Sequence, residues 1–302
     1  MRKLLIMFLI SLILLCACEN NEIEEPVVNR FSGIENNLNL DKDNYPIIDG
    51  STANIPLAEI LLEYFLDLSL DKVSTMVEFN TTDIAYENLA NHRCDLVLAY
   101  EVSPETKEEL GPLADFDYYE IGVDALVFLV NSYNPVRSLT TKELQDIYTG
   151  KIVNWLEVKG EDFEIIPYQR SKKSGSQTMM EKLVMKDIIM MERPSEEIET
   201  MSGLVDAILE YSNRENALGY SVYYYVVNMY ESSNITLLEI DDIIPNNTTI
   251  ADKTYPFINP FYAVVRKDEP ENSPARLLAK WLSGPNGNKI LELAGYVPAK
   301  EN

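Results

Sequence analysis

Histidine is almost absent from this chain of 302 residues, which contains only His92. Without a histidine partner, His92 cannot build a histidine-based zinc site, and a Ser-His-Asp catalytic triad is implausible. The sequence also lacks the Gly-x-Ser-x-Gly elbow of hydrolases and the Gly-x4-Gly-Lys-Ser/Thr phosphate loop. We therefore expect a protein that is not an enzyme and that needs neither a metal nor a cofactor.

Basic residues are about half as common as acidic ones. The 25 Lys and Arg residues face 49 Asp and Glu residues, which gives a net charge of −24. This field repels nucleic acid and anionic lipid headgroups, so we exclude both as partners. It also repels free anions at long range. If the ligand is an anion, its affinity must come from short, desolvated hydrogen bonds.

Long apolar runs are rare, and the clearest one stands at the N-terminus. Arg2 and Lys3 precede an apolar run at residues 4–15, which is too short to span a bilayer as a mature helix. The following Leu15-Cys16-Ala17-Cys18 is similar to the bacterial lipobox, in which cleavage leaves the cysteine as a lipid-bearing N-terminus. We expect residues 1–17 to be a lipoprotein signal peptide and Cys18 to be the lipid anchor, which places the protein on the outer face of the cell membrane.

Ordinary signal-peptidase cleavage, with Cys18 left as a plain thiol, is the alternative. The third cysteine, Cys94, is a single free thiol once Cys18 carries lipid. An internal disulfide is then excluded, and the stability of the exported protein must come from a packed core.

The length of the chain predicts two lobes. About 285 residues follow the expected cleavage site, more than one small core usually organises. Residues 18–44, rich in Asn, Glu and Asp, predict a flexible tether. We expect residues 45–130 and 260–302 to form lobe 1 and residues 131–259 to form lobe 2, with hinge strands near Asn131 and Asn259-Pro260.

Short apolar runs alternate with segments of helical periodicity after residue 44. This alternation predicts an α/β fold, with a mostly parallel sheet flanked by helices. The expected strands are 45–49, 73–79, 95–100, 124–131, 164–168, 235–240 and 261–267. The expected helices are 56–68, 83–91, 141–148, 176–185, 203–211, 273–282 and 286–294.

A guanidinium precedes a Ser-Gly-Ser turn in the segment Arg170-Ser171-Lys172-Lys173-Ser174-Gly175-Ser176. Arg170 can offer two N–H donors to two oxygens at once. The Ser174 and Ser176 hydroxyls and the amides of the turn can point at the remaining oxygens, beside the free N–H groups of a helix start. The pattern indicates a grip for a small oxyanion.

Polar loops follow three expected strands, where ligands gather in open α/β sheets. Ser51 and Thr52 follow the first strand, Thr81 the second, and Glu101 the third. Capping of the following helix is the alternative for Ser51 and Thr52. A solvated surface position is the alternative for Glu101.

The order of these motifs resembles the phosphate-binding proteins of bacterial ABC transporters. The resemblance rests on Asp-Gly-Ser-Thr (49–52), Gly-Lys-Ile-Val-Asn-Trp (150–155), Arg-x-x-x-Ser-Gly-Ser (170–176), Gly-Tyr-Ser (219–221) and Gly-Tyr-Val-Pro (295–298). It implies a type II periplasmic-binding-protein fold, in which two lobes close over one dehydrated oxyanion. It also implies inorganic phosphate and ABC permease subunits as partners, and a monomer.

Residue by residue, the resemblance implies that Thr52, with Ser51 beside it, and Thr81 contact the anion from lobe 1. Its Arg-x-x-x-Ser-Gly-Thr motif falls on Arg170, Ser174, Gly175 and Ser176, with Ser in place of Thr. Where the family commonly has Ser-Asp, this chain has Tyr100-Glu101. A carboxylate there accepts a hydrogen bond from protonated phosphate and rejects sulfate, so Glu101 is the first candidate for that role, with Asp124 and Asp49 as alternatives.

We therefore expect an extracytoplasmic lipoprotein that captures phosphate and delivers it to an ABC permease. Two alternatives stay open at this point. One keeps the fold and binds another oxyanion or a small organic anion. The other is a sensor or surface lipoprotein without a role in transport.

Overall fold

The computed structural model describes residues 30–186, 188–230 and 232–299. The chain divides into two units, residues 1–32 and residues 33–302. Of the first unit only residues 30–32 are described, as part of a turn. The expected signal peptide and Cys18 lie outside the described residues. The fold reported below is that of the second unit.

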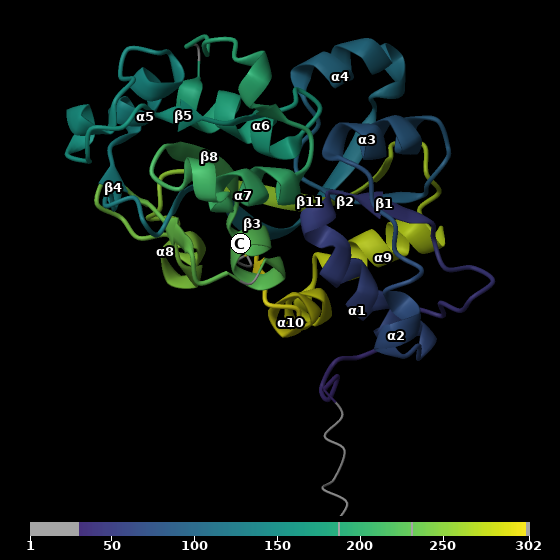
Figure 1. The fold of residues 1–302 in the computed structure, drawn as a ribbon. Helices are drawn as coiled ribbons and strands as arrows, with labels where there is room; N and C mark the ends of the chain where they lie inside the picture. The colour runs from purple at the N-terminus through teal and green to yellow at the C-terminus, as the bar shows by residue number, and fades with distance from the viewer. Residues whose placement is uncertain (1–29, 187, 231, 300–302) are drawn as a thin grey trace, which may run out of the picture. The chain divides into compact units, whose positions relative to one another are not determined.

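A mixed eight-stranded sheet lies at the centre of the described fold (Figure 1). Its strands follow the order β1-β2-β11-β3-β8-β5, and β9 and β12 also pair with β3. The bounds are β1 Ile48–Gly50, β2 Leu96–Ala99, β3 Phe116–Asn131, β5 Ile166–Pro167, β8 Ala217–Val222, β9 Ile235–Leu237, β11 Ile258–Arg266 and β12 Val297–Pro298. Two separate ladders join β4 (Ser138–Leu139) to β10 (Glu239–Ile240) and β6 (Gln169–Arg170) to β7 (Glu197–Ile198).

Strand β3 runs through both halves of this sheet. Its residues 116–125 pair with β11, and residues 126–129 pair with β8. From Ile121 onward every residue of β3 is buried, as its continuous apolar run predicts. At the junction the Leu126 amide donates to the Phe257 carbonyl at 3.0 Å, just before β11 begins. The backbone therefore passes between the two halves of the sheet at neighbouring points, in β3 and at the start of β11.

Helices cover both faces of the sheet (Figure 1). α3 (Thr82–Ala90) packs against β1, β2 and β11, and α9 (Pro274–Leu282) packs on the opposite side of these strands. In the other half, α7 (Met201–Leu209) contacts β8 and β3, and α6 (Gly175–Met179) contacts β6 and β8. The remaining α-helices are α1 Ile55–Leu66, α2 Leu70–Val73, α4 Pro104–Leu110, α5 Thr141–Tyr148, α8 Asn247–Ala251 and α10 Pro285–Leu293.

The strand expected at residues 73–79 is wrong. The chain forms the short helix α2 and then a turn, in which the Met76 amide donates to the Val73 carbonyl at 2.9 Å. β1 pairs directly with β2, so no ladder is formed by residues 74–80. The other expected strands and helices are present with shifted bounds, and α5 has the expected bounds.

The sheet is also less parallel than expected. β1 and β2 are parallel, as are β5 and β8, but β3 is antiparallel to all four of its neighbours. The physical reason is the chain path. The chain leaves the first half of the sheet through β3 and returns through β11 in the opposite direction.

Residues 33–35, within the expected tether of residues 18–44, lie against the folded core. The Lys289 ammonium donates to the Gly33 carbonyl at 2.6 Å, and the Trp281 indole N–H donates to the Glu35 carbonyl at 3.2 Å. These contacts attach the segment to α9 and α10. A flexible tether therefore stays a prediction only for the residues before Gly33.

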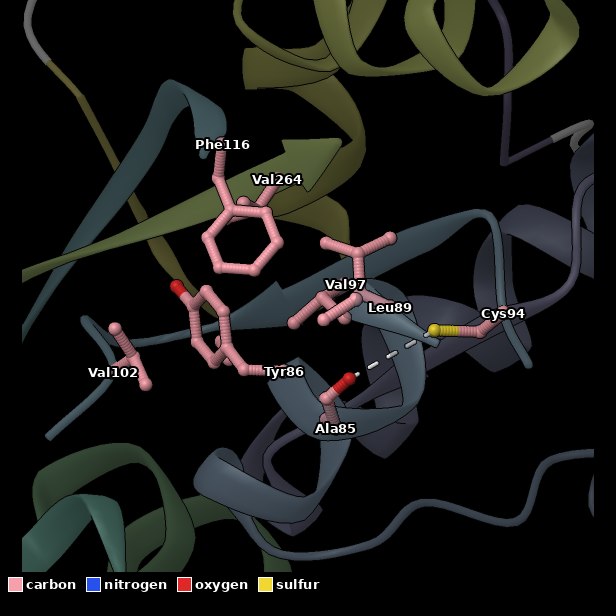
Figure 2. Packing of buried hydrophobic residues seen from close by; sticks show 10 residues of the cluster. Ala85, Tyr86, Leu89, Cys94, Val97, Val102, Phe116 and Val264 are labelled. Atoms are coloured by element: carbon pink, nitrogen blue, oxygen red, sulfur yellow. Dashed lines mark hydrogen bonds between the residues drawn. The ribbon is translucent and has the colours of Figure 1, made fainter. Parts of the chain in front are cut away.

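One part of the hydrophobic core lies between α3, β2 and β11 (Figure 2). Tyr86 and Leu89 of α3 are fully buried, and the Tyr86 ring lies 5.4 Å from the Phe116 ring. The Cys94 thiol faces the Ala85 carbonyl at 3.9 Å. Burial raises the pKa of this thiol to about 12, so Cys94 stays protonated and packs as a small apolar side chain.

Leu89 provides a test of this core. We expect Leu89→Ala to lower the free energy of unfolding by about 2–5 kcal/mol, because it leaves a cavity in a fully buried cluster. The control is Ile84→Ala on the same helix, where the side chain is 37% exposed and the cost should be about 1 kcal/mol or less. Urea titration followed by circular dichroism measures both, and equal losses would contradict this assignment of the core.

Candidate anion-binding site

Arg170 is buried at the end of β6, with 4% of its surface exposed. Its Nε donates to the Ile198 carbonyl at 3.0 Å, and its Nη2 donates to the Glu199 carbonyl at 2.8 Å. The parallel pairing of β6 with β7 sets this geometry, since Arg170 and Ile198 are register partners. The other terminal nitrogen, Nη1, is buried and has no partner among the described residues.

Three arginines are buried in the described part of the chain, and Arg170 is the one without a carboxylate. Arg276 pairs with Asp117 at 2.6 Å, and Arg266 pairs with Glu269 at 2.6 Å. Burial lowers the pKa of Arg170 to about 10, which leaves the guanidinium charged at neutral pH. A buried charge held only by neutral carbonyls is costly unless an anion completes its coordination.

Three buried hydroxyls on neighbouring segments also lack a hydrogen-bond partner among the described residues. Ser174 and Ser176 flank Gly175 at the start of α6, and Thr81 precedes α3. Their Oγ atoms are buried and have no hydrogen-bond partner among the described residues. Ser174 and Thr81 occupy N-cap positions, yet neither side chain caps its helix. Helix capping therefore does not satisfy these two hydroxyls.

Gly175 lies where the two halves of the sheet bring their loops together. A Cβ atom at this position would lie 2.5 Å from Thr82 Oγ1 and 3.3 Å from Tyr100 Cδ2. Lys173 also reaches across, to the Glu87 carboxylate at 2.6 Å. The Arg-x-x-x-Ser-Gly-Ser segment and the loops after residue 80 and after β2 are thus in contact. Glycine is the residue that allows this approach.

The first loop is braced by Asp49. This buried carboxylate accepts from the Gly50 amide at 2.7 Å and from the Asn80 amide and side chain at 3.0 and 2.8 Å. Ser51 is buried beside it, and Thr52 Oγ1 lies 3.6 Å from Met201 Sδ, near the carbonyls that hold Arg170. Asp49 thus fixes the loop that presents Ser51 and Thr52.

Glu101 takes a different position from the hydroxyls. Its carboxylate forms an ion pair with Lys182, and the two side chains are 43% and 51% exposed. It is not among the buried groups that lack a partner. The structure brings the segments of the other predicted residues together but directs the Glu101 carboxylate to Lys182. A direct contact between Glu101 and an anion stays a prediction.

Residues 44–283 match the family model described as a PBP superfamily domain. The chain belongs to the PBP superfamily. Its curated relatives include the phosphate-binding protein PstS of Bacillus subtilis, 27% identical over 210 residues, which are 69% of this chain and 66% of the relative. The PstS protein of Borreliella burgdorferi is 24% identical over 315 residues, which cover 99% of this chain and all of the relative.

Solved structures of other proteins have the same fold as this PBP-superfamily chain. A phosphate ABC transporter substrate-binding protein from Clostridium perfringens has a TM-score of 0.66 at 21% identity, with 84% of this chain and 98% of that one covered. An ABC-type phosphate transport receptor from Vibrio cholerae has a TM-score of 0.60 at 19% identity, with 83% and 98% covered. The predicted α/β type II periplasmic-binding class is confirmed, as is the resemblance to phosphate-binding proteins. The lobe boundaries stay a prediction.

The sequence analysis missed two residues that support Arg170. The Tyr220 hydroxyl accepts from the Arg170 backbone amide at 3.0 Å and donates to Gln177 Oε1, so β8 holds β6 in place. The one sequence signal for this role is general: a tyrosine hydroxyl needs a hydrogen-bond partner when it is buried.

Asp124 lies in the middle of β3, where the two halves of the sheet meet. It accepts from the Tyr100 hydroxyl at 2.8 Å, the Ala125 amide at 2.7 Å and the Tyr224 amide at 3.2 Å. Burial raises its pKa from 3.8 to about 6 despite these bonds. The loop after β2 is thereby tied to the region around β8 in this PBP-superfamily fold.

The raised pKa of Asp124 predicts the direction in which the stability of the fold changes with pH. Between pH 4 and 6 the unfolded chain releases the Asp124 proton while the folded chain retains it, so stability falls as the pH rises through this window. The shift corresponds to about 3 kcal/mol.

The measurement is the free energy of unfolding from pH 4 to 7 for the natural protein and for Asp124→Asn, which cannot titrate. The natural protein should lose about 2–3 kcal/mol more than the variant over this range. Parallel pH profiles would show that Asp124 ionises normally in the folded state.

Proposed function

We propose that this protein is an extracytoplasmic solute-binding lipoprotein that captures inorganic phosphate and delivers it to an ABC permease. The single observation that carries the proposal is the buried Arg170 guanidinium, whose Nη1 has no partner and faces no carboxylate counterion among the described residues. The unpaired hydroxyls of Thr81, Ser174 and Ser176 supply further donors on segments that are in contact. The relatives named as phosphate-binding proteins support phosphate as the anion.

The chemistry of these groups suits a dehydrated tetrahedral anion. A guanidinium and several hydroxyls replace the hydrogen bonds of the water shell that the anion loses. The net charge of −24 does not attract anions from a distance, so the binding free energy must come from these short contacts. The groups bind and orient an anion, and we expect no catalytic step.

We infer that binding closes two lobes over the anion. The proposal is supported by the passage of the chain between the halves of the sheet at only two neighbouring points in the described residues, β3 and the start of β11. It is also supported by the contact of Gly175 with Thr82 and Tyr100, which come from the other half. An anion stabilises the closed arrangement only through contacts that it makes with both sides.

We place the protein outside the cytoplasm as a monomer, held to the membrane by lipid on Cys18. The N-terminal pattern of Arg2-Lys3, the apolar run and the Leu-x-Ala-Cys sequence supports this part of the proposal. No helix within residues 30–186, 188–230 and 232–299 is long and apolar enough to cross a membrane.

Replacing Arg170 tests the function. We expect Arg170→Ala to weaken phosphate binding at least about 30-fold, because removing one partner of a buried charge pair costs about 2 kcal/mol or more. Isothermal titration calorimetry measures the affinity. The matched control is Arg214→Ala, whose guanidinium stacks on Tyr133 at the surface and should leave the affinity unchanged.

The melting temperature of the anion-free protein controls for misfolding. It should stay nearly the same in Arg170→Ala, since this variant removes an uncompensated charge. Unaltered phosphate affinity in a folded Arg170→Ala variant would remove Arg170 from the site. Failure of the natural protein to bind phosphate would refute the proposed function.

A further inference from the structure

Four carboxylates of the first half of the sheet lie beside the loops that carry the candidate hydroxyls, and each is committed to another partner. They are Asp49, Asp83, Glu101 and Asp124. Asp49 braces the first loop, and Asp124 accepts from Tyr100 and two backbone amides. Neither can turn toward an anion without breaking these bonds.

Asp83 follows Thr81 and is fully buried. Its carboxylate accepts from the Ser103 amide at 2.9 Å, the Ser103 hydroxyl at 2.5 Å and the Thr106 hydroxyl at 3.0 Å. These bonds tie the start of α3 to the start of α4. Asp83 is therefore a structural acceptor.

Glu101 differs because its partner is a single lysine. This lysine comes from the helical segment after Gly175, whereas Glu101 lies in the loop after β2. Lys182 lies in the helical segment that continues α6, and its ammonium pairs with the Glu101 carboxylate. Both side chains are about half exposed. This ion pair holds the carboxylate at the surface, outside the buried group of Thr81, Arg170, Ser174 and Ser176.

The polar atoms left over in the buried group can all donate hydrogen bonds. They are Arg170 Nη1 and the hydroxyls of Thr81, Ser174 and Ser176. Asn54 Oδ1 is the one unpaired buried acceptor on the first loop in the described residues, and its amide nitrogen donates to the Leu98 carbonyl at 2.9 Å. A neutral amide oxygen repels an anion far less than a carboxylate does.

We propose that Lys182 is a specificity-determining residue. It holds the Glu101 carboxylate away from the buried group of Thr81, Arg170, Ser174 and Ser176, the proposed anion pocket, so that the site accepts tetrahedral dianions with or without a proton. This inference rests on the proposed function. A carboxylate inside the pocket would need a proton on the ligand as its partner and would exclude sulfate. A pocket of donors has no such requirement, so sulfate and phosphate compete for it.

Calorimetric titration of the natural protein with phosphate and with sulfate at pH 7 is the first test. We expect the two dissociation constants to lie within about tenfold of each other. Glu101→Gln should leave their ratio unchanged within about twofold, because the carboxylate does not face the ligand.

The second test frees Glu101 from its lysine. Lys182→Met should raise the preference for phosphate over sulfate at least fivefold, about 1 kcal/mol, since the released carboxylate can then turn toward the pocket. Adding Glu101→Gln to this variant should restore the natural ratio. The matched control is Lys142→Met, which removes the same charge from an exposed lysine of α5 that also pairs with a carboxylate, Asp146, and should not change the ratio.

The outcomes separate this inference from the proposed function. Binding of neither anion would refute the proposed function. Binding of phosphate with sulfate more than about 100-fold weaker, relieved by Glu101→Gln, would overturn the inference and return the carboxylate to the pocket. An unchanged ratio in Lys182→Met would overturn the role of Lys182.

Discussion

A buried guanidinium without a counterion is the constraint on which the site depends. Arg170 gives two of its donors to backbone carbonyls of residues 198 and 199, and these bonds fix its orientation without neutralising its charge. The other buried arginines of the described chain have carboxylates of their own. Among the described residues no carboxylate forms an ion pair with Arg170, although the protein is acidic. In the proposed function, an anion from solvent supplies this partner.

The surrounding structure keeps that cation available. Tyr220 and Gln177 hold the backbone of Arg170, and Gly175 lets the following loop approach the loops of the other half of the sheet. Asp49 and Asp124 brace those loops with buried hydrogen bonds. Asp49 and Asp124 thus position the candidate donors, and neither pairs with Arg170.

The sequence predicted much of this arrangement. Helical periodicity placed most helices within a few residues of their observed bounds. The anion grip indicated by the spacing of Arg170, Ser174, Gly175 and Ser176 stays a prediction. The failures have physical causes. Residues 73–79 have the composition of a strand, but β1 pairs directly with β2, so no partner is left for them. The parallel sheet was expected from strand and helix alternation, which carries no information about the direction in which β3 and β11 pair.

The chain by itself therefore determined the class of fold and the chemical groups of the site, because periodicity, turn residues and donor types are local properties. Only the tertiary structure decided which groups are unpaired and where Glu101 points. The pairing of Glu101 with Lys182 joins residues 81 positions apart, as the bracing of Arg170 by Tyr220 joins residues 50 positions apart. Contacts of that kind follow from the packing of whole elements, which no local pattern in the sequence records.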